Sequence, residues 1–301
     1  METCCILYNP KAGNGRGLNE ARRLDSIWSG KSLDYIDVTT IVDIRAYLDS
    51  LPAETTVVLA GGDGTLNHFI NDMGGEAPAR DIYYFAAGSG NDFLRDAERT
   101  RDDPPFLLNP YLQNLPTVTV NGMTRYFLNG IGYGIDGYCC EVGDKQRLKS
   151  DKPVNYTAIA IKGLLFGYHR TLADVCVDGD TKAYRAVWLA PTMKGRFYGG
   201  GMMCAPGQNR LDPEGSVSTM VMTGKSKLKT LIVFPSIFKG GHIRHREMVT
   251  IRPGHEVTVR FNRPTALQID GETVLGVTEY SVSTRKSVGA AEKSEAAVVA
   301  E

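Results

Sequence analysis

The sequence predicts two domains: an α/β domain over residues 1–118 and a mainly antiparallel β-sandwich domain over residues 119–285. In the first part, strand and helix patterns alternate, as they do in proteins built around a parallel sheet. After the prolines at positions 104, 105 and 110, the strand patterns become short and end in turns, which is typical of antiparallel sheets. Strand patterns of the first part also end in glycine-rich turns, and parallel sheets bind ligands at such strand ends.

The elements of the first domain follow from short apolar runs, which predict buried strands, and from apolar residues at helical spacing, which predict helices. Strands are expected at Cys4–Tyr8, Leu33–Thr39, Val57–Ala60 and Ile82–Ala86, and helices at Leu18–Trp28, Ile41–Leu51 and from Thr65 onward. Strands that alternate with helices pair in parallel, so their carboxyl ends should share one edge of the sheet.

The second domain is predicted from turn-bounded segments in which apolar and polar residues alternate. Strands are expected at Val118–Val120, Arg125–Leu128, Ala173–Val177, Ala183–Ala190, Ser216–Met222, Glu247–Ile251, His255–Phe261, Ala266–Ile269 and Thr278–Ser283, and one helix at Asn155–Tyr168. Gly130–Gly134 contains part of a dinucleotide-binding pattern, but without a strand–helix–strand context we expect a turn there. The end of the chain could return to the first domain, and residues 286–301 lack periodicity and are predicted to be disordered.

The overall composition narrows the choice of partners and location. Lys plus Arg equals Asp plus Glu at 34 each, so no global charge attracts nucleic acid, and we expect no nucleic-acid partner. The six cysteines contain no C-x-x-C pair and no zinc spacing, which favours reduced thiols in the cytoplasm. The start has no basic segment before an apolar one and no run of 18 apolar residues occurs, so neither a signal peptide nor a membrane span is expected.

The most informative segment is Gly61–Asn67, with the sequence GGDGTLN, which follows a predicted strand and begins a helical pattern. Glycines let backbone N–H groups approach a phosphate closely, and a helix N-terminus adds favourable positive charge. The Asp63 carboxylate would repel a phosphate unless a divalent cation lay between them. The segment therefore predicts a site for a metal-bound nucleotide, although an isolated Gly-Gly-Asp-Gly could also be an ordinary turn.

Two further turns repeat this design at neighbouring strand ends. Asn9–Gly15 (NPKAGNG) follows the first strand, and Gly88–Phe93 (GSGNDF) follows the strand at 82–86 and adds a carboxylate at Asp92. A third segment, Gln268–Glu272 (QIDGE), lies in the second domain. Its carboxylates would face the glycine turns if the two domains close on each other, so the active site is expected in the cleft between them.

Phosphoryl transfer requires groups that cradle phosphates, a magnesium ion held by carboxylates, and a group that orients or deprotonates the acceptor hydroxyl. The turns and carboxylates above can supply all three. Lys31 and Lys225 each stand in a Gly-Lys-Ser triplet, but neither triplet is preceded by the first glycine of a Walker A loop.

At these residues the chain resembles the diacylglycerol-kinase-like lipid kinases, a family that includes bacterial diacylglycerol kinases and sphingosine kinases. The shared segments run through nearly the whole chain: NPKAGNG at 9–15, GGDGTLN at 61–67, GSGNDF at 88–93, NGIGYGID at 129–136, GGGMMCAP at 199–206 and IDGE at 269–272. The resemblance implies a kinase that uses ATP and Mg²⁺ between an α/β domain and a β-rich lipid-substrate domain. It implies a lipid hydroxyl as the acceptor, with diacylglycerol as the first candidate.

The resemblance also implies roles for individual residues. The expected ATP contacts are Asn9, Pro10, Lys11, Ala12, Gly13, Thr39 or Thr40, Gly61, Gly62, Asp63, Gly64, Thr65, Asn67, Gly88, Ser89 and Asn91. Asp63, Asp92 and Glu272 would hold the catalytic Mg²⁺ through water, and Asp212 with Glu214 would hold a second, structural cation. The base that acts on the lipid hydroxyl would be Asp270 or Glu272, with Asp63 as the competing choice.

The chain departs from the family pattern at two places in the glycine turns. Ala86-Ala87-Gly88-Ser89 stands where the family usually has Pro-x-Gly-Thr, and the serine keeps the hydroxyl. His68 follows GGDGTLN where the family often has a glutamate, which puts one detail of helix capping or nucleotide contact in question.

A lipid substrate must be reached from the membrane surface. Residues 225–260 contain eight Lys or Arg and two acidic residues, with Leu231–Pro235 and Ile237–Phe238 among them. Basic residues beside apolar ones suit peripheral contact with the inner leaflet of the membrane, although a solvated face is the alternative. A homodimer is also compatible with the sequence.

Two other functions remain open at this point. NAD kinases share the GGDGT turn, but they lack the NPKAGNG and IDGE segments of this chain. A nucleotide-binding regulator without catalysis is the second alternative, yet such a protein has no need of four carboxylates near phosphate.

Overall fold

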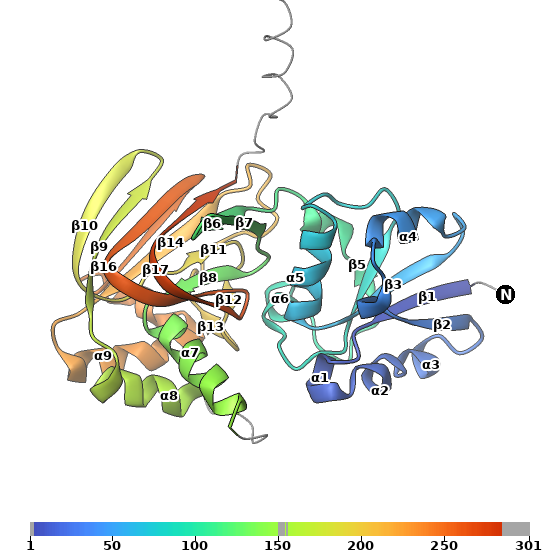
Figure 1. Cartoon of the computed structure of the whole chain (residues 1–301), viewed down its shortest axis with the longest axis horizontal. Helices are drawn as coiled ribbons and strands as arrows, with labels where there is room; N and C mark the ends of the chain where they lie inside the picture. Colours follow the sequence, from blue (N-terminus) through green and yellow to red (C-terminus); the bar gives the residue numbers. More distant parts are fainter. Residues whose placement is uncertain (1–2, 150–153, 155, 285–301) are drawn as a thin grey trace, which may run out of the picture.

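The computed structural model describes residues 3–149, 154 and 156–284, and it contains the two predicted domains (Figure 1). The first domain, blue to cyan in the figure, is a mostly parallel sheet with helices on its faces. The second domain, green to red, consists of antiparallel strands with helices gathered along one edge. The predicted fold class is therefore confirmed, while the tail predicted at 286–301 lies outside the described residues.

The sheet of the first domain has the strand order β2-β1-β3-β4-β5. Its strands are β1 (Thr3–Tyr8), β2 (Ser32–Asp37), β3 (Thr56–Gly61), β4 (Ile82–Ala86) and β5 (Phe106–Leu107). The first four are parallel, and only β5 runs antiparallel to its neighbour β4. The strand β5 was not predicted, because a pair of residues carries no alternation that a pattern could reveal.

Helices cover both faces of this sheet because successive strand side chains point to opposite sides. The helices are α1 (Ala12–Gly15), α2 (Gly17–Ala21), α3 (Leu24–Ile27), η1 (Val38–Thr40), α4 (Ile44–Ser50), α5 (Asp63–Asp72), α6 (Asp92–Asp96) and η2 (Asn109–Leu112). Ile6 packs in a core with Leu24, whereas Leu7 packs in the opposite core with Leu66. The single helix predicted at 18–28 is divided into α2 and α3.

The second domain is dominated by a ten-stranded antiparallel sheet with the order β7-β6-β17-β16-β8-β11-β14-β10-β9, in which β15 pairs with β14. Its strands are β6 (Thr117–Val120), β7 (Met123–Tyr126), β8 (Gly130–Tyr133), β9 (Thr171–Val177), β10 (Asp180–Leu189), β11 (Thr192–Met193), β14 (Val217–Thr223), β15 (Val249–Gly254), β16 (Glu256–Ile269) and β17 (Glu272–Ser283). The first part of β16 pairs with β9 and its last part with β8, so the sheet closes on itself. A small hairpin, β12 (Phe197–Tyr198) and β13 (Met202–Met203), lies outside it.

The glycines at 130–134 form a strand and not the predicted turn. A Cβ on Gly130 would lie 2.7 Å from the sulfur of Met193, and a Cβ on Gly134 would lie 2.5 Å from the carbonyl oxygen of Trp188. These glycines therefore allow close packing of β8 against its neighbours. An unpredicted helix, α7 (Ile135–Arg147), follows directly.

The remaining helices lie together at one edge of the second domain (Figure 1). They are α8 (Tyr156–Lys162), the π-helical turn η3 (Gly163–Gly167), α9 (Lys227–Val233), η4 (Phe234–Lys239) and η5 (Gly241–Arg244). The predicted helix at 155–168 corresponds to α8 and η3. None of the described helices is long and apolar enough to cross a bilayer. The six cysteines, all among the described residues, form no disulfide.

The predicted domain boundary at residue 118 falls inside β6. Residues 117–120 already pair with β17, so the second domain begins by Thr117. The strand β17 ends at Ser283 within the same sheet. The described end of the chain therefore stays in the second domain and does not return to the first.

Candidate functional site

The three predicted glycine turns meet at one edge of the first sheet. The strands β1, β3 and β4 are adjacent and parallel, so the turns that follow them lie side by side. A Cβ on Gly88 would lie 2.3 Å from the Cα of Gly62, and a Cβ on Gly13 would lie 3.1 Å from the carbonyl oxygen of Ala87. Glycine is therefore required at Gly88, because the backbones of the β3 and β4 turns touch there.

Side chains fix these turns to one another. The Asn9 amide donates to Thr65 Oγ1 at 3.1 Å, and Asn9 Oδ1 accepts the Lys11 backbone N–H at 2.9 Å. Gly64 and Ser89 are exposed at the same edge, whereas Thr65 is buried. The glycine turns are thus joined by side-chain hydrogen bonds. Thr65, for which the sequence predicts an ATP contact, is buried and links the turn after β1 to the turn after β3.

The predicted residues Thr39 and Thr40 lie in η1, directly after β2. Because β2 pairs in parallel with β1, its carboxyl end lies at the same edge of the sheet as the glycine turns. Both hydroxyls donate to Asp37, Thr39 to the carboxylate at 2.7 Å and Thr40 to the carbonyl oxygen at 2.8 Å. The two exposed threonines therefore present acceptor lone pairs with a fixed orientation.

Asp63 connects the β3 turn to the β4 turn. Its Oδ2 accepts the backbone N–H of Asp92 at 2.8 Å, and its Oδ1 accepts that of Phe93 at 3.0 Å. These N–H groups belong to the first turn of α6, which has no partner for them within the helix. The carboxylate for which the sequence predicts metal binding therefore caps α6 and fixes the position of Asp92.

Asp92 is a buried carboxylate with backbone partners from the second domain. Its Oδ2 accepts the Gly200 backbone N–H at 2.8 Å, from a loop in which Gly199, Gly200 and Gly201 all have positive φ. Burial raises the pKa of Asp92 to about 6, and the nearby Asp63 carboxylate adds to this effect. A buried carboxylate beside a second carboxylate is a favourable environment for a divalent cation.

Asp270, a predicted candidate for the base, is instead fully engaged in hydrogen bonds. Its Oδ1 accepts the backbone N–H groups of Asn129 and Gly130 at 2.8 and 2.9 Å. Its Oδ2 accepts the Leu128 N–H at 2.6 Å and the Asn67 amide at 2.7 Å. Burial raises the pKa of Asp270, although these hydrogen bonds favour the ionised form. This geometry argues against Asp270 as the base and gives it the role of joining α5 to the second domain.

Glu272 remains accessible on the same β16–β17 turn, with 41% of its side chain exposed. Its Oε2 lies 2.6 Å from an Arg125 nitrogen, and its Oε1 lies 3.6 Å from His68 Nε2. Arg125 also donates to Asn67 Oδ1 at 2.7 Å. Asn67 is buried between Arg125 and Asp270, so its side chain helps to hold the residues around Glu272 in place. The sequence predicted a contact with the nucleotide for this residue.

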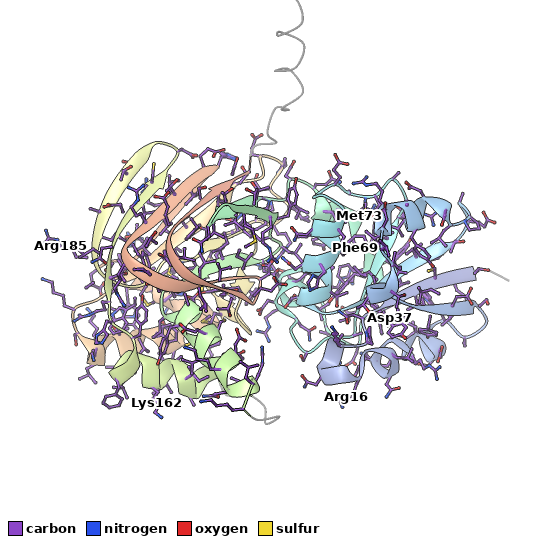
Figure 2. The ribbon with its side chains drawn as sticks, in the orientation of Figure 1. Arg16, Asp37, Phe69, Met73, Lys162 and Arg185 are labelled. Carbon is purple, nitrogen blue, oxygen red and sulfur yellow. The ribbon has the colours of Figure 1, made fainter. Side chains whose placement is uncertain are left out.

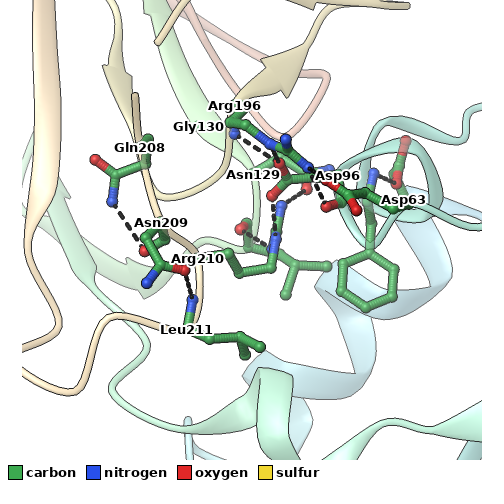
Figure 3. Close-up of polar contacts among 12 residues, drawn as sticks. Asp63, Asp96, Asn129, Gly130, Arg196, Gln208, Asn209, Arg210 and Leu211 are labelled. Carbon is green, nitrogen blue, oxygen red and sulfur yellow. Dashed lines mark hydrogen bonds and ion pairs between the residues drawn. The ribbon is translucent and has the colours of Figure 1, made fainter. Parts of the chain in front are cut away.

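A buried ion-pair network that the sequence did not indicate lies beside the carboxylates (Figure 3). Asp96 lies one helical turn after Asp92 on α6 and accepts hydrogen bonds from Arg196 at 2.7 Å and from Arg210 at 2.6 Å. Arg210 also donates a hydrogen bond to Asn129 Oδ1 at 2.6 Å. In the sequence, the only sign of this link between the domains is that Asp92 and Asp96 are four residues apart, which places both carboxylates on one face of a helix.

The three predicted ligands of the catalytic cation do not form one compact group. Within residues 3–149, 154 and 156–284, no cluster of three metal-ligating side chains is present. The Asp63 carboxylate contributes to the raised pKa of Asp92, whereas Glu272 pairs with Arg125. At the second predicted site, Asp212 accepts the backbone N–H groups of Glu214 and Ser216, each at 3.1 Å. The structure thus shows Asp212 closing its own turn.

Asp136 is a second buried carboxylate, and its pKa supports a test of stability. Burial raises the pKa of Asp136 from 3.8 to about 6, and its Oδ2 accepts the Tyr198 hydroxyl at 2.7 Å. A raised native pKa means that the folded state loses stability as pH rises from about 4 to about 6. Asp136→Asn removes this ionisation. The free energy of unfolding of the variant minus that of the wild type should therefore be about 2 kcal/mol higher at pH 7.5 than at pH 4.5, as measured by urea unfolding. An equal difference at both pH values would contradict this assignment.

Comparisons with known proteins agree with this architecture. The family model described as "Diacylglycerol kinase catalytic domain" matches residues 3–120. The model described as "YegS C-terminal NAD kinase beta sandwich-like domain" matches residues 129–285, more than half of the chain. The two matches follow one another as the two structural domains do.

Individual relatives are more distant. A protein named diacylglycerol kinase from Mycobacterium tuberculosis (strain H37Rv) is 24% identical over 257 residues, covering 82% of this chain and 81% of the relative. YtlR of Bacillus subtilis (strain 168) is 22% identical over 317 residues, covering 94% and 96%. The crystal structure of a diacylglycerol kinase from Bacillus anthracis (strain Sterne) superposes with a TM-score of 0.61 at 16% identity, covering 94% of this chain and 93% of the other. At this identity the superposition shows the fold.

Proposed function

Since this chain belongs to the diacylglycerol-kinase-like family of lipid kinases, we propose that it transfers the γ-phosphoryl group of ATP, with Mg²⁺, to the hydroxyl of diacylglycerol. The observation that supports this most directly is the arrangement around α5. The glycine turns and Asp63 lie at its N-terminal end, and Asn67, one turn later, leads through Arg125 to the exposed carboxylate Glu272.

The residues at the glycine turns suit a nucleotide with a divalent cation. Gly62 and Gly88 let the β3 and β4 turns touch, and Gly64 is exposed at the first turn of α5 with no atom within 4 Å of a Cβ position, so phosphate oxygens can approach the backbone there. Asp63 and Asp92 offer the oxygen ligands that Mg²⁺ prefers. The side-chain oxygen of Asn91 is buried and has no hydrogen-bond partner among the described residues, which leaves an acceptor for a ligand or a water.

The chain's own groups then have distinct tasks. Asp63 holds the first turn of α6, and this places Asp92 beside it. The bound cation would neutralise charge that develops on the phosphates during transfer. Arg125 orients Glu272 through one carboxylate oxygen, while the other remains available to accept the proton of the lipid hydroxyl. Asp270 keeps the turn in place and does not exchange protons with the substrate.

Two glycine substitutions test the nucleotide cradle. A Cβ on Gly64 meets no atom within 4 Å, so Gly64→Ala should fold normally and be equal or greater in stability, by about 0.5 kcal/mol. It should nevertheless weaken MgATP binding about tenfold or more, because a methyl group would stand where the phosphates approach. Gly88→Ala should instead lower stability by about 1–3 kcal/mol, since its Cβ would press on Gly62. Calorimetric titration and urea unfolding separate the two effects, and unchanged MgATP binding by Gly64→Ala would contradict the cradle.

The direct test is to incubate the purified protein with radiolabelled ATP, Mg²⁺ and mixed micelles of diacylglycerol, sphingosine, ceramide and a polyprenol, with NAD in a parallel reaction. Label in phosphatidic acid is the expected result. Label in another lipid would keep the lipid kinase and change the acceptor. Label in NADP would replace the proposal with NAD kinase activity, and no label in any product would favour a nucleotide-binding regulator.

A further inference from the structure

The helices at the edge of the second domain carry apolar side chains on both of their faces. On α9, Thr230 and Val233 are buried, whereas Leu228 and Ile232 are 70% and 71% exposed. Residues four apart lie on the same side of a helix, so Leu228 and Ile232 form one exposed stripe. A helix that is apolar on its outer side as well as its inner side indicates a surface that meets another apolar phase.

The segment α8–η3 repeats this arrangement next to α9. Leu164 is buried, but Phe166 is 78% exposed and Ile161 is 48% exposed. The two segments are in contact, because the Lys227 ammonium donates to the Leu165 carbonyl oxygen at 2.7 Å. We call the surface formed by Ile161, Phe166, Leu228 and Ile232 the helix face. Both segments run along the lower edge of the second domain in Figure 1.

Basic residues surround the helix face. Lys162 follows Ile161 and points away from the domain in Figure 2, and Lys227 bridges the two segments. Arg170, which lies three residues after η3, and Lys225, which lies two residues before α9, line a cavity of about 420 Å³. Residues 156–172 and 217–246 contain no aspartate or glutamate. The neighbouring Glu247 pairs with Lys229 at 2.8 Å and lies 3.5 Å from His245, and the two segments themselves supply no carboxylate to the other basic residues around the helix face.

We propose that the helix face docks on a bilayer of anionic phospholipids, with the apolar side chains inserted among the acyl chains and the basic residues at the headgroups. The proposal deepens the lipid kinase function, since docking would bring the protein to its membrane-borne acceptor. The charge argues against a second copy of this chain, because a symmetric contact would place lysines against lysines. The aliphatic character of Ile161, Leu228 and Ile232 favours acyl chains over nucleic acid, which proteins contact through aromatic stacking and phosphates.

The test is flotation of the full chain with vesicles of equal parts phosphatidylglycerol and phosphatidylcholine, compared with phosphatidylcholine alone. Wild-type protein should float with the anionic vesicles. Phe166→Ser with Ile232→Ser, and separately Lys162→Glu, should each reduce the bound-to-free ratio about tenfold or more. The matched controls are Val42→Ser, an exposed apolar residue just before α4, and Arg45→Glu, an exposed basic residue in its first turn, both outside the helix face. Both controls should float as the wild type does.

The outcomes separate docking from catalysis. Flotation of the helix-face variants equal to that of the wild type would overturn the docking proposal, whatever the kinase assay shows. Flotation that depends on the helix face, in a protein that labels no lipid, would support docking and overturn the proposed function. A dimer in light scattering that the Phe166→Ser and Ile232→Ser changes dissociate would show that a second copy occupies the helix face, and this would also overturn docking.

Discussion

Glu272→Gln is expected to lower the turnover number for lipid phosphorylation by a factor of about 10²–10⁴ while MgATP binding stays within about threefold of the wild type. Glutamine keeps the shape of the side chain but cannot accept a proton. The carboxylate is 41% exposed, and Arg125 contacts only its Oε2 closely, so the fold should tolerate the change. Steady-state kinetics with diacylglycerol micelles and calorimetric titration of MgATP measure the two quantities.

Glu279→Gln provides the matched control on the same strand. Its carboxylate is 40% exposed and pairs with Arg260, so it resembles Glu272 in exposure and in having an arginine partner. Activity should remain within about twofold of the wild type in this variant. If Glu272→Gln also retained full turnover, Glu272 would not be the base, and Asp63→Asn would become the variant to measure.

Asp270→Asn is expected to produce the largest loss of stability, about 2–4 kcal/mol in urea unfolding at neutral pH. The aspartate accepts three backbone N–H groups and the Asn67 amide, and all four donors belong to buried residues. An asparagine would present its own N–H₂ group toward two of these donors, and a buried donor without an acceptor carries the full cost of desolvation.

The loss of stability is expected because hydrogen-bond donors surround Asp270. The same substitution at an exposed aspartate, Asp174→Asn, therefore serves as the control. Asp174 is exposed on β9, and its change should alter stability by less than about 0.5 kcal/mol. Asn67→Ala removes one of the four donors to Asp270 together with the oxygen that accepts from Arg125, and its stability should fall between those of the two variants. A stability of Asp270→Asn equal to that of Asp174→Asn would show that the four hydrogen bonds contribute nothing measurable.

The parts of the fold that the sequence predicts correctly depend on local patterns. Val57–Ala60 is an uninterrupted apolar run because the sheet is covered on both faces, and the glycines after it mark the turn. The glycine turns of the candidate site were found for the same reason. The helix α7 was missed because the glycines of β8 imitate a ligand-binding turn, while their true cause is contact with Met193 and Trp188.

The interdomain contacts could not be predicted, because their partners are distant in sequence. Asp270 lies 142 positions from Leu128, and Asp96 lies 114 positions from Arg210. A motif such as IDGE identifies the carboxylates but not the groups around them. The different roles of Asp270 and Glu272, two residues apart on one turn, follow only from the tertiary structure.

The pairing of β6 with β17 has a consequence for how the chain folds during synthesis. Thr117 and Ser283, which are joined by a hydrogen bond, are separated by 166 positions. A ribosome therefore releases the complete first domain long before the last strand of the second domain emerges, and the first domain can fold alone. The edge of β6 stays uncovered throughout this interval. Chains that terminate before β17 are consequently expected to expose a strand edge to aggregation.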